Sequence, residues 1–252
     1  MNNRSESDSI QKISSISVLR EAWHLIPGMK LPIFLRMFLS GFLLAISGLI
    51  IHLLAQHTIV TSVMQAVVRV LFGLIISYIF FQMTMLGDRR ALSMPFDEKS
   101  LREDVASVKK NIFYLVIIYF LIVHTIDEMV AYFILSHETR VAARLVIDII
   151  QFYCTMPITI FSLPLVVIKH AEIGAALAEG FRKMGLYWKE ITICFLCVLL
   201  LPYMYTFSIL TKLITSPSVS IILNVVVVIL MIWLMPMSFN MAGIFFRDAY
   251  RK

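Results

Sequence analysis

Long uncharged runs alternate with short charged stretches along this 252-residue chain. A helix needs about 20 apolar residues to cross the hydrocarbon core of a bilayer, which is about 30 Å thick. The runs without Asp, Glu, Lys or Arg cover 37–68, 70–87, 149–168, 191–211 and 213–246. Together with a shorter run discussed next, they predict membrane-spanning helices near 37–55, 66–86, 112–134, 145–168, 191–213 and 220–246.

The third of these helices is the one that the pattern supports least directly. Its apolar stretch, 112–123, is too short to span, and His124, Asp127 and Glu128 follow before the chain becomes apolar again. Charge placement favours a span nevertheless. With six spans, 18 of the 22 Lys and Arg residues lie on one side, the bias that marks the cytoplasmic face. We therefore expect an all-α, polytopic membrane bundle of six transmembrane helices with both termini cytoplasmic.

A Leu-x-Glu pattern recurs before each expected helical hairpin, at Leu19–Glu21, Leu101–Glu103 and Leu177–Glu179. It predicts short amphipathic helices at the membrane interface, each followed by two crossings, so that the chain consists of three parallel two-helix repeats. Chance recurrence of so short a pattern is the alternative. The predicted organisation is a polar cytoplasmic tail, 1–18, and one six-helix transmembrane domain, 19–252, with repeat units 19–98, 101–172 and 177–252.

The third unit shows the amphipathic character most clearly. Ala176, Gly180, Met184 and Tyr187 recur at helical spacing, whereas basic and further aromatic residues fall alongside this stripe. Such a helix is expected to lie in the interface, with its basic groups toward lipid phosphates and its aromatic rings at the boundary. The residues predicted to face lipid in this way are Trp23, Arg182, Lys183, Trp188 and Lys189.

Composition narrows the functional classes. Hydrophobic residues make up 60% of the chain and charged residues 15%, with a mean hydropathy of +0.87. Soluble domains are nearer 45–50% apolar and about 25% charged, so a nucleic-acid module, a secreted disulfide scaffold and a soluble enzyme are excluded. The net charge of +6 follows from the basic cytoplasmic segments. We expect anionic lipid headgroups as partners at that face, and no nucleic acid.

Ionisable residues gather near the predicted outer ends of the third and fourth helices. Ionisable groups inside a bilayer are costly, so each is a candidate for function. One interpretation is a proton- or cation-coupled pocket that opens outward, with Asp127 or Asp148 as the carrier and His124 as the relay. The other is an ion-paired cap that holds helix ends together at the headgroup level. The members of this predicted polar cluster are His124, Asp127, Glu128, Arg144 and Asp148.

Neither a catalytic motif nor a metal-binding motif is expected. The chain has no Gly-x-Ser-x-Gly, no His-Glu-x-x-His and no phosphate-binding glycine loop. Cys194 and Cys197 form a Cys-x-x-Cys pair, but it falls in an apolar helix without further ligands nearby in sequence. We interpret these two and Cys154 as small buried hydrophobic residues, and predict no catalytic residue, no metal and no cofactor.

A resemblance appears around the start of the third unit, at Pro164–Val167, Ala175–Leu177, Gly180–Arg182 and Tyr187–Lys189. These motifs, with Glu21-Ala22-Trp23 near the start and Phe245-Phe246-Arg247 near the end, resemble a family of bacterial six-span inner-membrane proteins whose role is uncharacterised. They are also similar to the membrane domain that is fused to some glycerophosphodiester phosphodiesterases. The resemblance implies a bacterial inner (plasma) membrane location. It implies no catalytic residues, because the phosphodiesterase chemistry of those fusions belongs to a separate soluble domain.

The sequence therefore predicts an integral membrane protein that is not an enzyme. The favoured hypothesis is a non-catalytic component that organises partners or lipids through its cytoplasmic interfacial helices. The alternative is a permease for small solutes or lipid headgroups that uses the outer acidic cluster. An intramembrane enzyme is the third and least supported hypothesis.

Overall fold

The computed structural model describes residues 13–54, 59–95, 97–133, 147, 149–212 and 217–251. Within these ranges it contains helices joined by short turns, and no strand. The side chains of 54, 59–62, 98, 127–133, 197–212 and 217–232 lie outside the description, although their backbone is helical. The predicted all-α class is confirmed for the described part of the chain.

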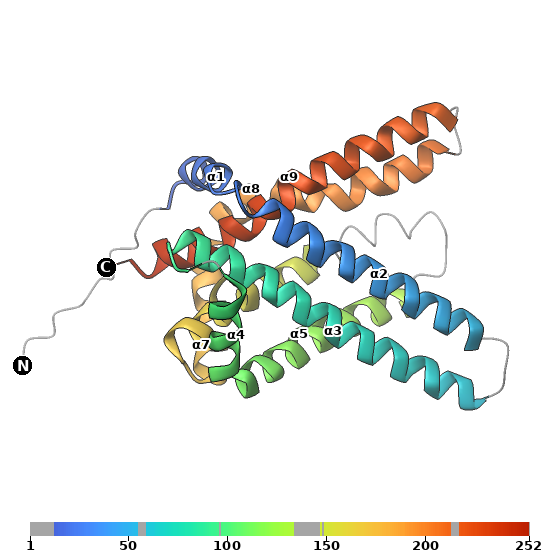
Figure 1. Ribbon diagram of the computed structural model, residues 1–252, viewed down its shortest axis with the longest axis horizontal. Helices are drawn as coiled ribbons and strands as arrows, with labels where there is room; N and C mark the ends of the chain where they lie inside the picture. The colour runs from blue at the N-terminus through green and yellow to red at the C-terminus, as the bar shows by residue number, and fades with distance from the viewer. Residues whose placement is uncertain are drawn as a thin grey trace, which may run out of the picture.

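The helices follow one another along the chain as Figure 1 shows. A further helical segment over 149–156 leads directly into η1. The elements are α1 (Ser15–His24), α2 (Lys30–Leu54), α3 (Ile59–Ala91), α4 (Glu98–Ser107), α5 (Lys109–Phe133), the π-helix η1 (Pro157–Ser162), α7 (Leu163–Lys169), α8 (Ile173–Lys212) and α9 (Pro217–Ala249).

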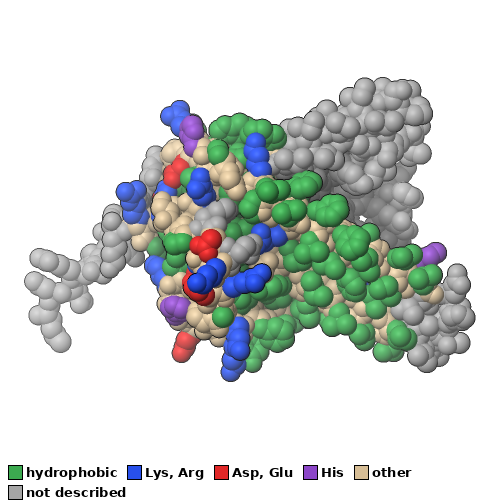
Figure 2. Space-filling model, in the orientation of Figure 1, with side chains coloured by type: hydrophobic (Ala, Val, Ile, Leu, Met, Phe, Trp, Pro, Cys, Tyr) green, Lys and Arg blue, Asp and Glu red, His purple; other side chains and the backbone are tan. Residues whose placement is uncertain are grey.

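Four helical stretches in the described residues are long and apolar enough to cross a bilayer. Side chains on the outer surface of these stretches are largely hydrophobic, and Figure 2 shows them covering one part of the molecule while Lys and Arg gather at the other. A large exposed apolar surface is expected where lipid replaces water as the solvent. The four stretches are Lys30–Leu53, Val63–Ala91, Lys109–Ile126 and Ile149–Lys169.

Helix ends differ from the ends of the uncharged runs. α2 begins at Lys30 rather than near 37, and α3 continues to Ala91 rather than stopping near 86. The reason is that an uncharged run marks the thickness of hydrocarbon, whereas a helix continues through the interface until its backbone is capped. α5 runs unbroken from Lys109 to Phe133, past Asp127 and Glu128, so the uncertain third helix is continuous.

Two of the three predicted short helices are separate elements. These are α1 and α4, and Asp97 caps the start of α4 by accepting a 2.9 Å hydrogen bond from the backbone N–H of Ser100. The third forms the first part of α8, which is divided by a kink at Tyr187, where φ is −113° and ψ is 16°. The third predicted short helix is therefore joined to the long helix that follows it.

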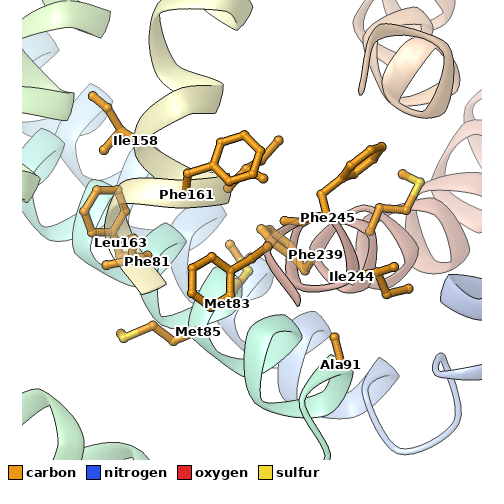
Figure 3. Packing of buried hydrophobic residues seen from close by; sticks show 14 of the residues in the cluster. Phe81, Met83, Met85, Ala91, Ile158, Phe161, Leu163, Phe239, Ile244 and Phe245 are labelled. Carbon is orange, nitrogen blue, oxygen red and sulfur yellow. The ribbon is translucent and has the colours of Figure 1, made fainter. Parts of the chain in front are cut away.

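The hydrophobic core lies at one end of the bundle, where α1, η1, α7, the first part of α8 and the final turns of α3 and α9 meet. Phe81, Phe161 and Phe245 are completely buried there and come from α3, η1 and α9. Figure 3 shows them among the buried side chains of this core. We call this region, residues 15–26, 79–93, 157–187 and 236–250, the packed end.

Glycines let α3 and α9 cross closely at the packed end. A Cβ atom on Gly87 would lie 2.2 Å from the carbonyl oxygen of Phe239, and one on Gly243 would lie 2.7 Å from the Cα of Asp88. Both obstacles are backbone atoms, which cannot rotate away. Small residues at the contact are the usual means by which membrane helices bring their backbones together.

The π-helical turn explains how α8 docks on the core. Pro157 begins η1, and Pro164 follows it; neither residue has the N–H that an α-helix would use at that point. The widened turn is buried, and the hydroxyl of Ser162 lies 3.0 Å from the carbonyl oxygen of Ala176 on α8. Gly180 completes the contact, since a Cβ there would lie 2.3 Å from Ser162 Oγ.

Candidate functional site

A pocket of about 640 Å³ opens at the packed end between segments that are far apart in sequence. α1, the end of α3, the end of α7 and the end of α9 each contribute to it. Three of the lining side chains are cationic and one is a carboxylate, so the lining carries net positive charge. The lining residues are Glu21, Ala91, Leu92, Ser93, Ile168, Lys169, Phe246, Arg247, Tyr250 and Arg251.

Arg247 holds one wall of this pocket in place. Its two Nη atoms donate to the two carboxylate oxygens of Glu21, with 2.8 Å between Nη2 and Oε2, and its Nε donates to Asp248 at 2.8 Å. Nη1 also donates to the carbonyl oxygen of Ala91, 3.3 Å away. These hydrogen bonds hold the pKa of the Glu21 carboxyl below its usual value, and the nearby charge of Arg251 acts in the same direction.

Lys169 supplies an ammonium group to the pocket at the last residue of α7. His170 follows in the left-handed conformation, with φ of 52°, and the N–H of Ala171 donates to the carbonyl oxygen of Leu165, which ends the helix. The Lys169 Nζ atom lies 4.4 Å from the centroid of the Tyr250 ring and is exposed. No carboxylate among the described residues pairs with it.

Tyr250 is held from its other side by α8. Its hydroxyl donates to Glu179 at 3.3 Å, while Lys183 lies 5.0 Å from its ring centroid and donates to the carbonyl oxygen of Ala249 at 3.0 Å. Burial and the Glu179 carboxylate both raise the pKa of Tyr250, so the ring stays neutral. Lys169 and Lys183 therefore both approach the Tyr250 ring. Because Glu179 and Lys183 belong to α8, that helix holds this lining residue of the pocket in position.

Adjacent charged residues at the end of α3 have contrasting surroundings. Arg89 is buried, and it donates to the carbonyl oxygens of Pro95 and Ser100 and to the Asp104 carboxylate, which ties α3 to α4. Asp88 is also buried, beside the α3–α9 crossing, and neither of its carboxylate oxygens has a hydrogen-bond partner in the described part of the chain. Arg89 is thus a structural anchor for the turn that carries Ser93 into the pocket.

Aromatic residues cluster on the surface where α1 meets α9. Trp23 on α1 stacks on Trp233 of α9 with 5.4 Å between ring centroids, and the Lys30 Nζ atom lies 3.0 Å from the Trp233 centroid. Both indole rings are exposed. Tryptophan and lysine in such a cluster are typical of the level where hydrocarbon gives way to headgroups.

Most of the residues predicted to face lipid have exposed side chains. Trp23, Trp188, Arg182 and Lys189 have accessible side chains, and Arg182 is paired with Glu179 on its own helix. Lys183 differs, because its ammonium group is engaged with the end of α9. The regular stripe at residues 176, 180, 184 and 187 is buried against protein rather than lipid.

The predicted outer polar cluster falls mostly outside the described residues. Arg144 and Asp148 lie outside them, and for Asp127 and Glu128 only the helical backbone of α5 is described. His124 is partly buried and stacks on Phe120, with 5.4 Å between ring centroids. The cluster stays a prediction.

Two of the cysteines have described side chains, Cys154 and Cys194. Cys194 is buried, with its Sγ 3.6 Å from the carbonyl oxygen of Ser15, and Cys154 is partly buried. No group of three or more His, Cys, Asp or Glu side chains in the described residues is arranged to hold a metal ion.

The pocket was not predicted from the sequence. Lys169 and Tyr250 each stand at a helix end, and nothing in their spacing indicates that they meet. Glu21 and Arg247 belong to the two terminal motifs of the resemblance, which is the signal that could have suggested their contact. Opposite charges in motifs at the two ends of a chain predict a pairing only when the ends are known to be neighbours.

Comparison of the chain with protein-family models, with curated proteins and with solved structures found no match.

Proposed function

We propose that this protein is a multi-pass membrane component that organises anionic lipids or partner proteins at the cytoplasmic face and carries out no catalysis itself. In this proposal α8 and α9 add two crossings to the four apolar stretches, so that six helices span the bacterial inner membrane. Both termini are then cytoplasmic, and the packed end lies on the cytoplasmic side. The excess of Lys and Arg at that end supports this orientation.

The observation that carries the proposal is the surface of α8 around its kink at Tyr187. Phe181 and Arg182 just before the kink, and Trp188 and Lys189 just after it, are all exposed, while the opposite face of the first part of the helix is buried in the core. A helix that is anchored by protein on one side and offers aromatic and basic groups on the other is suited to contact headgroups or an acidic partner.

The arrangement of helices supports the threefold repeat as part of the same proposal. A short helix precedes a helical pair three times: α1 before α2 and α3, α4 before α5 and 149–169, and the first part of α8 before its remainder and α9. Each unit thereby places one short helix at the same end of the bundle.

Lipid selectivity tests the proposal. The protein is extracted in a mild uncharged detergent, and the anionic lipid that co-purifies is compared with its fraction in the source membrane by mass spectrometry. We expect enrichment in the wild type and its loss in the double variant Arg182→Gln, Lys189→Gln. The matched control is Lys99→Gln, Arg102→Gln, which removes the same charge from the polar helix α4.

Two outcomes would count against the proposal. One is equal loss of lipid in both double variants, which would show general electrostatic attraction rather than a function of α8. The other is solute flux in proteoliposomes that falls when Asp127 or Asp148 is replaced by Asn, which would favour the permease.

A further inference from the structure

The pocket at the packed end has the lining of an anion-binding site. We propose that it binds a phosphate group, carried either by an anionic lipid headgroup or by a soluble phosphate ester. This inference rests on the proposed function, because it names a ligand for the face through which the protein is proposed to act.

The first argument is the excess of cationic groups over carboxylates. Lys169, Arg247 and Arg251 line the pocket with one carboxylate, Glu21. Lysine and arginine are the usual side chains that bind phosphate. Nε, Nη1 and Nη2 of Arg247 each already donate to a protein acceptor, so Arg247 adds positive charge while Lys169 offers hydrogen-bond donors.

The second argument is the state of Lys169. Its ammonium group has three N–H donors, and in the described part of the chain none of them donates to a protein acceptor. The rings of Tyr250 and Phe246 lie 4.4 and 5.8 Å from Nζ and hold it beside the pocket without neutralising its charge. Tyr250 is itself fixed by Glu179 and so keeps the ammonium in place.

The third argument is Ser93, which lines the pocket in the left-handed conformation, with φ of 55°. This conformation ends α3, because the N–H of Ser93 donates to the carbonyl oxygen of Arg90 and the N–H of Met94 donates to that of Arg89. These two hydrogen bonds fix the backbone of Ser93 beside the pocket. Its hydroxyl has no protein partner within the described residues and is available to a ligand oxygen.

Glu21 acts as an internal anion in this arrangement. Its carboxylate is bonded by Arg247 and lies within the field of Arg251, which is the position that a ligand oxygen would take. Removing that carboxylate therefore strengthens binding of an external phosphate, whereas removing Lys169 weakens it. The two substitutions are expected to act with opposite signs.

The volume of the pocket, about 640 Å³, suits a headgroup-sized ligand. It also exceeds what a single inorganic phosphate fills. A phosphate ester therefore uses the space better than the free ion does.

The test measures the thermal midpoint of the full chain in phosphatidylcholine vesicles, because a ligand that binds the native state raises this midpoint in a concentration-dependent way. In one arm, inorganic phosphate or glycerol phosphate is added at constant ionic strength. In the other, phosphatidylglycerol replaces part of the phosphatidylcholine. A saturable rise in the first arm identifies a soluble ligand, and a rise confined to the second identifies a lipid headgroup; both support the proposal.

Three variants give the decisive comparison. Lys169→Gln is expected to weaken the apparent affinity about tenfold. Glu21→Gln is expected to strengthen it, and Lys99→Gln, an exposed lysine on α4, to leave it unchanged.

The proposal is overturned if no saturable rise occurs in either arm, if Lys169→Gln behaves like Lys99→Gln, or if Glu21→Gln weakens binding. If the Arg182 and Lys189 variant loses its lipid while Lys169→Gln has no effect, the pocket is wrong and the proposed function stands. If the pocket variants behave as expected but lipid enrichment does not depend on α8, the pocket stands and the proposed function is wrong.

Discussion

Glu21 on α1 and Arg247 near the end of α9 form a two-point ion pair across 226 residues of sequence. α1 crosses α9 where the side-chain amide of Asn240 donates to the carbonyl oxygen of Ala22, 3.3 Å away. From this crossing Glu21 reaches Arg247, while Trp23 reaches Trp233 in the opposite direction along α9. A ten-residue helix is thereby fixed at three points, and one of them forms a wall of the pocket.

The first prediction concerns the energy of this pair. The variants Glu21→Gln, Arg247→Gln and the double variant form a double-mutant cycle, with the free energy of unfolding measured in uncharged detergent. We expect a coupling energy of about 1 kcal/mol, because the geometry is bidentate but both side chains are partly exposed to solvent. Strict additivity of the two single changes would show that the pair contributes nothing to stability.

The second prediction is the pH dependence of stability. Hydrogen bonds from Arg247 lower the pKa of Glu21 in the folded protein, so its contribution is complete above the pKa of the unfolded state, about 4.5. The contribution is lost as pH falls through the lowered folded value. Thermal midpoints measured from neutral to acidic pH should therefore fall more steeply for the wild type than for Glu21→Gln. If the thermal midpoints of the two proteins fell in parallel with pH, Glu21 would not be the source of this pH dependence.

The third prediction concerns the crossing of α3 and α9. Gly87→Ala and Gly243→Ala each place a methyl group against backbone atoms, so we expect each to destabilise the protein by about 1–3 kcal/mol. Gly48→Ala is the matched control, because nothing lies within 4 Å of its Cβ position in α2. There the better helix propensity of alanine is expected to be neutral or favourable. Similar midpoints for all three variants would be inconsistent with a close crossing.

The fourth prediction compares two neighbouring arginines. Arg89→Gln removes a buried cation that donates to two carbonyl oxygens and Asp104, and we expect a loss of about 2–3 kcal/mol. Arg90→Gln, next to it, loses one 3.2 Å hydrogen bond to the carbonyl oxygen of Pro27 and is expected to cost less than about 1 kcal/mol. Chemical denaturation measures the free energy of unfolding of the two variants. An equal loss for both would refute the prediction that Arg89 contributes more than Arg90.

Periodicity predicted one face of α8 correctly but not its surroundings. The stripe of residues 176, 180, 184 and 187 is a true helical face, and it is buried. Whether lipid or protein covers such a face depends on shape as well as polarity. Gly180 fits the turn at Ser162, and that fit depends on the π-helix that Pro157 begins.

Lys183 shows that the sequence also leaves the surroundings of a charged side chain undetermined. Its place beside Arg182 in the sequence predicted an ammonium group among headgroups, but it donates to Ala249 instead. A lysine side chain is long enough to reach either environment from the same helix position, so only the position of its neighbours decides. The end of α9 lies within reach of the Lys183 side chain, and only the tertiary structure brings the two together.

The sequence alone determined the all-helical class and where the helices occur, because a backbone in hydrocarbon must satisfy its own hydrogen bonds and an apolar run of sufficient length has no other regular solution. It also placed the short helices α1, before the first apolar run, and α4, between two of the runs. Tertiary structure alone brought Lys169, Tyr250 and Ser93 to one pocket with Glu21 and Arg247. Hydrophobic patterning specifies which side of a helix is buried, whereas the identity of its neighbour depends on close packing between residues that are distant in the chain.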